Sequence, residues 1–201
     1  LDAISATNLT VKAGGAVTQS AAATVTGLAS VDAGTNNVTL SQANNAFGSV
    51  AVTGGAVSIT DKEALALDAV KATSLAVKAG GAVTQVAEKT LAVTSATSVD
   101  AGKNNVTLAN TGNDFGSVAV TGASVSITDT NAVVLDAINA TSLTVKAGGA
   151  VTQVAEKALE VTGATTVDAG ANNVTLANAG NDFNTVAITA GAASVTDKNA
   201  V

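Results

Sequence analysis

The chain has 201 residues, a mass of 19.1 kDa and a formal net charge of −6; it lacks Cys, His, Trp, Tyr, Pro and Met, and its nine basic residues are all Lys. Without His or Cys, ordinary zinc sites, catalytic triads and thiol nucleophiles are excluded. Without Arg, and with an acidic balance, the electrostatic footprint of nucleic-acid binding is missing. No apolar run approaches the roughly 18 residues of a spanning helix, so we expect no membrane span.

Taken in chain order, the sequence consists of three copies of one unit. The phrase Leu-Asp-Ala-Ile/Val returns at offsets of 66 and then 68 residues, starting at Leu1, Leu67 and Leu135. Lys-Ala-Gly-Gly-Ala-Val-Thr-Gln and Asn-Asn-Val-Thr-Leu recur in the same order, and the two-residue difference arises between Gln19 and Val31. The predicted repeat units of one continuous solenoid are residues 1–66, 67–134 and 135–201.

Each unit divides again into three sub-repeats of about 22 residues, marked by Val-x-Ala-Gly or Val-Thr-Gly. Apolar residues alternate with small or polar ones, as in Val106-Thr107-Leu108, and Gly, Asn and Asp interrupt the runs. A period of two is typical of strands, whereas no stripe at helical spacing lasts beyond two turns. The pattern predicts an all-β parallel β-helix of about nine coils, three per unit, and with coils about 4.8 Å apart a rod roughly 43 Å long.

The residue after the Val of each sub-repeat is predicted to point outward, which sets Lys and Asp one coil apart in every unit. An exposed pair of opposite charges is worth only about 0–1 kcal/mol, so the pattern indicates register more than stability. The predicted structural ladder is Lys12, Asp32, Thr53, Lys78, Asp100, Thr121, Lys146, Asp168 and Thr189.

Other recurring polar motifs favour structural roles. Gly-x-Asn-Asn lacks the spacing of a calcium-binding β-roll, so we interpret it as a turn satisfied by Asn side chains. Asp61, Asp129 and Asp197 lie a full unit apart, too far for the paired carboxylates of a glycosidase. We therefore predict no catalytic, cofactor-binding or metal-binding residue and no enzymatic activity. The three aromatic residues are predicted to plug the core at corners: Phe47, Phe115 and Phe183.

Two further surface features leave alternatives open. Thr is abundant beside Val, and a flat face with regular Thr rows could bind ice or glycan; these Thr residues are scattered over several faces, which favours ordinary outward strand positions. Asn-x-Thr sequons are candidate glycosylation sites or simple turn residues. These sequons begin at Asn8, Asn37, Asn105, Asn139 and Asn173.

Three phrases resemble the repeats of filamentous-haemagglutinin-like exoproteins of Gram-negative bacteria: Val-Lys-Ala-Gly-Gly-Ala-Val-Thr-Gln, Val-Asp-Ala-Gly-x-Asn-Asn-Val-Thr-Leu and Asn-Asp-Phe-Gly-Ser-Val-Ala-Val-Thr-Gly. The resemblance covers all three units. It implies a right-handed parallel β-helix shaft, an extracellular or cell-surface location, and a role in adhesion, biofilm or fibre formation.

From these observations we expect a structural shaft of an extracellular adhesin or filament, with a β-solenoid that binds ice or glycan as the alternative. No divergent coil caps either end, and open coil ends present unpaired strand edges. The expected partners are therefore further copies of the same repeat, stacked end to end, and cell-surface or matrix glycans. We expect no cofactor and no nucleic acid.

Overall fold

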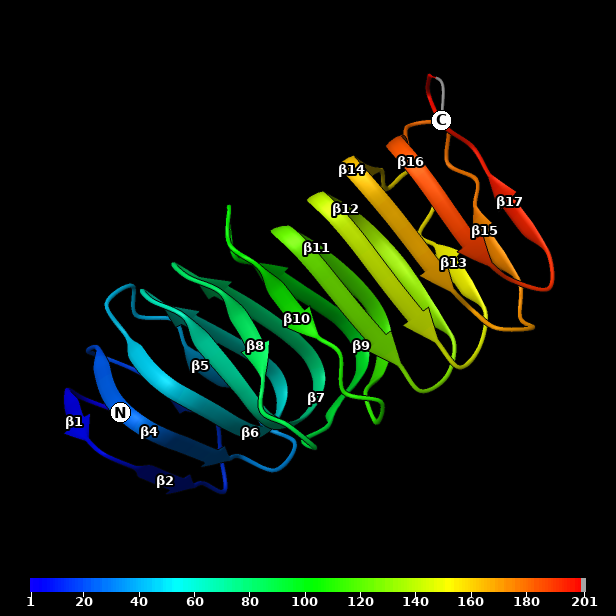
Figure 1. Ribbon diagram of the computed structural model, residues 1–201. Helices are drawn as coiled ribbons and strands as arrows, with labels where there is room; N and C mark the ends of the chain where they lie inside the picture. Colours follow the sequence, from blue (N-terminus) through cyan, green and yellow to red (C-terminus); the bar gives the residue numbers. More distant parts are fainter. Residues whose placement is uncertain (200–201) are drawn as a thin grey trace.

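The computed structural model describes residues 1–199, and every regular element in them is a β-strand. All strand pairings are parallel and join the strands into one 17-stranded sheet. The sheet winds into a rod whose successive turns stack from the N-terminal to the C-terminal end (Figure 1). Within this range no helix could cross a membrane.

The strands are β1 (Ile4–Ala6), β2 (Leu9–Lys12), β3 (Val17–Thr18), β4 (Ala23–Asp32), β5 (Val38–Leu40), β6 (Ala46–Asp61), β7 (Leu65–Ala79), β8 (Val83–Gln85), β9 (Leu91–Asp100), β10 (Val106–Leu108), β11 (Asp114–Asp129), β12 (Val133–Ala147), β13 (Val151–Gln153), β14 (Leu159–Asp168), β15 (Val174–Leu176), β16 (Asp182–Thr189) and β17 (Ala193–Val195).

One turn of the solenoid has three sides. In the middle of the chain, β8 forms side A, the first part of β9 (91–93) forms side B and its second part (97–100) forms side C. The chain then returns to side A in β10, where Val106 pairs with Val83 of the turn before. The longer strands bend around corners, and register shifts mark the bends. The predicted parallel β-solenoid is therefore confirmed.

The number of turns per unit differs from the expected three. Val52 pairs with Val70, whereas Ile59 pairs with Val77. The 25-residue interval from Val52 to Val77, expected to be one coil, thus contains a full turn and one additional side. The chain makes about ten turns rather than nine, which corresponds to a rod about 48 Å long.

A unit therefore has ten sides, one more than three complete turns. In the first unit these are residues 4–6, 9–12, 17–18, 23–25, 28–32, 38–40, 46–47, 49–53, 57–61 and 65–67. Each unit is consequently rotated by a third of a turn relative to the unit before it. The Val-Thr-Gln phrase illustrates the rotation, since Thr18 lies on side C, Thr84 on side A and Thr152 on side B.

The core is a continuous column of inward Val, Leu, Ile, Ala and Phe side chains, because alternate residues of each strand point inward. Two hydroxyl side chains interrupt this column. Thr97 is only 1% exposed and lies in register between Leu75 and Val118 on side C. Thr165 occupies the equivalent place one unit later, and within residues 1–199 neither Oγ1 atom has a hydrogen-bond partner.

We predict that Thr97→Val and Thr165→Val each stabilise the protein. A buried polar group without a partner costs about 1–3 kcal/mol, and Val has nearly the shape of Thr. Urea denaturation should show a gain of about 1 kcal/mol for each variant, with an unchanged m-value. The exposed Thr107→Val is the control and should stay within about 0.5 kcal/mol of wild type. A loss of stability in Thr97→Val would mean that the hydroxyl has a partner.

Candidate functional site

The outward residues of the predicted ladder fall into three short ladders. Lys12 pairs with Asp32, and Asp32 pairs with Thr53, all on side B. The next turn continues with Lys71, whereas Lys78 pairs with Thr60 on side C. One ladder through nine coils is therefore wrong, because each unit is rotated. The two remaining ladders are Lys78–Asp100–Thr121 on side C and Lys146–Asp168–Thr189 on side A.

The Asp of each ladder holds a turn. The Oδ1 of Asp32 accepts a hydrogen bond of 3.0 Å from the backbone N–H of Gly34, whose φ of 59° suits glycine. Asp100 and Asp168 bind Gly102 and Gly170 in the same way. The ion pairs found in residues 1–199 lie elsewhere: Lys62–Glu63, Lys89–Asp68 and Lys198–Asp182.

Asn side chains of the Gly-x-Asn-Asn turns link successive turns of the solenoid. The Nδ2 of Asn36 donates to the carbonyl of Ala33, and the Oδ1 of Asn37 accepts the N–H of Ala56 in the next turn at 3.0 Å. This is the turn role expected for the motif. The five sequon Asn residues, Asn8, Asn37, Asn105, Asn139 and Asn173, are all exposed, and their glycosylation stays a prediction.

A buried amide cluster occupies one corner of each unit. Asn113 is fully buried, and its Oδ1 accepts the N–H of Leu91 at 3.0 Å while its Nδ2 donates to the carbonyl of Leu108. The same amide exchanges two hydrogen bonds with the side chain of Gln85. Asn45 and Asn181 form equivalent clusters with Gln19 and Gln153. The sequence analysis missed this role, although Asn recurs at all three positions.

Next to each amide cluster, a Phe side chain enters the core, and an Asp carboxylate accepts the backbone N–H of that Phe. Phe115 is 1% exposed, and its N–H donates to the Oδ2 of Asp129 at 2.7 Å. The Oδ1 of Asp129 accepts the N–H of Asn131 at 2.8 Å. Phe47 with Asp61 and Phe183 with Asp197 repeat the arrangement. All three Phe side chains are buried in the core, and the three Asp side chains accept hydrogen bonds from backbone N–H groups.

Burial raises the pKa of the Asp129 carboxyl above its ordinary value of 3.8, although the two backbone N–H donors oppose this effect. Burial is likewise the largest cause of the raised pKa of the Asp61 carboxyl. No group of three His, Cys, Asp or Glu residues that could hold a metal ion occurs in the described part of the chain.

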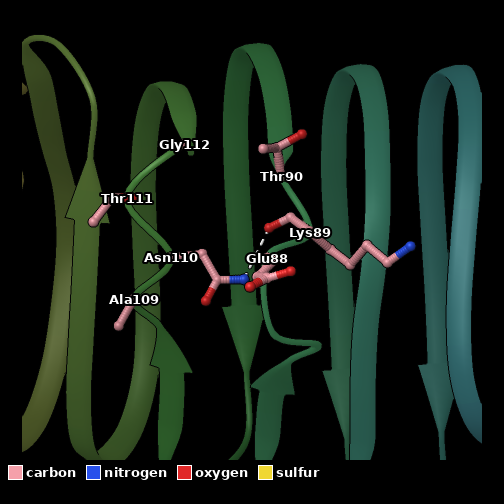
Figure 2. A pocket seen from close by; sticks show the side chains of 7 residues that line it. All are labelled: Glu88, Lys89, Thr90, Ala109, Asn110, Thr111 and Gly112. Atoms are coloured by element: carbon pink, nitrogen blue, oxygen red, sulfur yellow. Dashed lines mark hydrogen bonds between the residues drawn. The ribbon is translucent and has the colours of Figure 1, made fainter.

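A shallow pocket of about 450 Å³ opens at the corner between sides A and B (Figure 2). The loop after β8 contributes Glu88, Lys89 and Thr90, and the loop after β10 contributes residues 109–112. An equivalent pocket of about 340 Å³ lies between Glu156 and Asn178, one unit later and one corner further round. The first unit is two residues shorter at this loop, and this length difference is a sequence signal of the pocket.

We predict that the protein becomes less stable as pH rises from 3.8 toward the raised pKa of Asp61 and Asp129. In that range the folded state keeps protons that the unfolded state has released, so deprotonation favours unfolding. Asp61→Asn/Asp129→Asn should flatten this slope in urea denaturation series. The double variant should also be less stable at every pH, because an amide has one acceptor oxygen and leaves one of the two backbone N–H donors at each site unpaired. An unchanged slope would contradict the assignment.

The family model described as "Repeats of unknown function (DUF5649)" matches residues 1–53, 54–121 and 122–190. Its second and third segments start 68 residues apart, as do the units that begin at Leu67 and Leu135. The family model and the units defined above therefore have the same repeat length but different starting positions within the repeat. No curated protein and no solved structure matches the chain. Because the three matches together cover nearly all of the sequence, the chain belongs to the family of DUF5649 repeats, and it forms a parallel β-solenoid.

Proposed function

We propose that this solenoid is the non-enzymatic structural shaft of an extracellular bacterial adhesin or filament. Its task is mechanical: it holds another part of a larger assembly away from a surface. The observation that carries this proposal is the way in which the units join, described next. The repeat phrases that resemble filamentous-haemagglutinin-like exoproteins support the extracellular and Gram-negative setting.

The junction between units has the longest backbone ladder of the rod. β6 and β7 share eleven registered residue pairs, and β11 and β12 share eleven as well. The other main pairings between turns, such as β4 with β6 and β7 with β9, share seven. A force along the rod therefore meets no weak seam between units. Such a design suits a shaft, because stability accumulates by nearest-neighbour stacking.

We further propose that copies of the repeat stack end to end. Gly80 and Gly148 approach the preceding turn so closely that an added Cβ would overlap the carbonyl oxygens of Lys62 and Thr130. Gly14 is the equivalent residue of the first unit, and nothing lies within 4 Å of an added Cβ there. A copy stacked before the first turn would give Gly14 the same close neighbour.

This difference provides the test. At high concentration, wild type should form fibres much longer than the roughly 48 Å of ten turns, with a continuous axial spacing of about 4.8 Å in electron micrographs. Gly14→Ala should keep the wild-type circular dichroism and melting curve but lose the long fibres. Gly80→Ala should damage the fold itself. Separate short rods of wild type, or equal fibres in Gly14→Ala, would overturn stacking.

A second candidate, an ice-binding or glycan-binding face, is supported by a column of hydroxyl side chains on side A. Thr107, Ser126, Thr144 and Thr166 pair successively in register and are exposed or half-buried. The column ends at Ala187, which pairs with Thr166.

If this column binds ice, wild type should inhibit ice recrystallisation, and Thr144→Lys should abolish the inhibition because a long charged side chain breaks the flat array. Thr121→Lys, at an exposed position on side C, is the control. No inhibition by wild type would remove ice as the ligand.

A further inference from the structure

We propose that the pockets beside Glu88 and Glu156 are two copies of a binding site for an amine-bearing sugar. The proposal does not rest on the shaft function, and neither depends on the other. It rests on the recurrence of the pocket, on the backbone of its Glu residue and on the chemistry of its lining.

The pocket is built from two loops that stack in successive turns. Asn110 lies between them, and its Nδ2 donates to the carbonyls of Val86 at 2.7 Å and Lys89 at 2.9 Å. Both bonds use the amide nitrogen, which leaves Oδ1 for a ligand (Figure 2). Asn178 makes the same two bonds, to Val154 and Lys157, in the second pocket. The Asn side chain therefore fixes the two loops of each pocket to one another.

The Glu residues of the two pockets have an unusual backbone. Glu88 has a φ of 64° and Glu156 a φ of 62°. These are the only non-glycine residues with positive φ in residues 1–199, and the other positions of this kind are Gly34, Gly102 and Gly170. Glycine adopts this conformation without strain, whereas Glu does not. Glu at both loop positions is explained if its carboxylate has a use that glycine cannot supply.

The lining offers acceptors and negative charge. Glu88 contributes a carboxylate and Asn110 an amide oxygen, whereas Thr111 points away from the Glu88 loop and Thr90 turns its methyl group toward Gly112 (Figure 2). The Lys89 side chain extends away from the far loop, and its Nζ lies 3.5 Å from the Oδ1 of Asp68 (Figure 2). An ammonium group next to hydroxyls complements this set, because charge-assisted hydrogen bonds to a carboxylate are the strong ones. An amino sugar carries both groups, whereas an acidic sugar would be repelled.

The units also provide internal comparisons. In the second pocket Ala158 and Ala179 replace the two Thr residues, so Glu156 and Asn178 are the shared elements. In the first unit the shorter segment around Ser20 has no Glu, and Gln42 stands where Asn110 and Asn178 stand later. We therefore expect similar binding at Glu88 and Glu156, and none at the corresponding corner of the first unit.

The test uses the full chain and a tetramer of glucosamine at pH 6, followed by amide chemical shifts. Saturable shifts are expected in residues 88–90 and 109–112 and around Glu156 and Asn178, and none around Ser20. Glu88→Gln/Glu156→Gln should weaken binding at least about tenfold, since a charged hydrogen bond is lost. The exposed pair Glu63→Gln/Glu160→Gln removes the same two charges outside both pockets and should bind as wild type. The N-acetylated tetramer should bind at least about tenfold more weakly.

A second variant separates binding from stability. Glu88→Gly/Glu156→Gly should raise the denaturation midpoint, because glycine relieves the backbone strain, and should lose binding all the same. The proposal is overturned if wild type shows no saturable shift up to about 10 mM tetramer. It is also overturned if the Gln or Gly variants bind as tightly as wild type, or if the shifts follow acidic residues along the whole rod.

Discussion

Parallel pairing between successive turns is the interaction on which the whole molecule depends. No turn has an interior of its own: the inward Val, Leu and Ile side chains of one turn are covered only by those of the turns before and after. Each stacking step adds a row of backbone hydrogen bonds and a layer of buried apolar surface at once. The longest such rows join β6 to β7 and β11 to β12, so continuous backbone pairing runs across each junction between units.

The corners, where the ladders are interrupted, are held by buried polar side chains. Asn113 bonds the backbone N–H of Leu91 and the carbonyl of Leu108, and Asp129 bonds the N–H of Phe115. Unpaired backbone groups at a buried bend would be costly. The same residue types that could suggest an active site in the sequence thus satisfy backbone groups at the bends.

The sequence analysis predicted the fold class because alternation, turn residues and internal repeats all indicate the same solenoid. It did not predict the rotation of successive units, because the interval from Val52 to Val77 is close to one turn in length. Only the pairing of Ile59 with Val77 shows that this interval contains an additional side. Nor did it predict the pocket, since the φ of Glu88 and the approach of two loops arise only from stacking. Buried Asn113 could have been suspected from its strict recurrence beside Phe.

The third-of-a-turn rotation has a consequence for the bending of a longer array. The sides of one unit are not alike: one corner carries a wider loop and another a tight Gly-Gly turn. If every unit faced the same way, these differences would add, and the rod would curve and flex toward one preferred direction. Because successive units point these corners in three directions and return to the starting orientation after three units, the curvature cancels and the flexural stiffness becomes the same on all sides. A longer array built from such units would therefore be straight by averaging, without any single unit having to be symmetric.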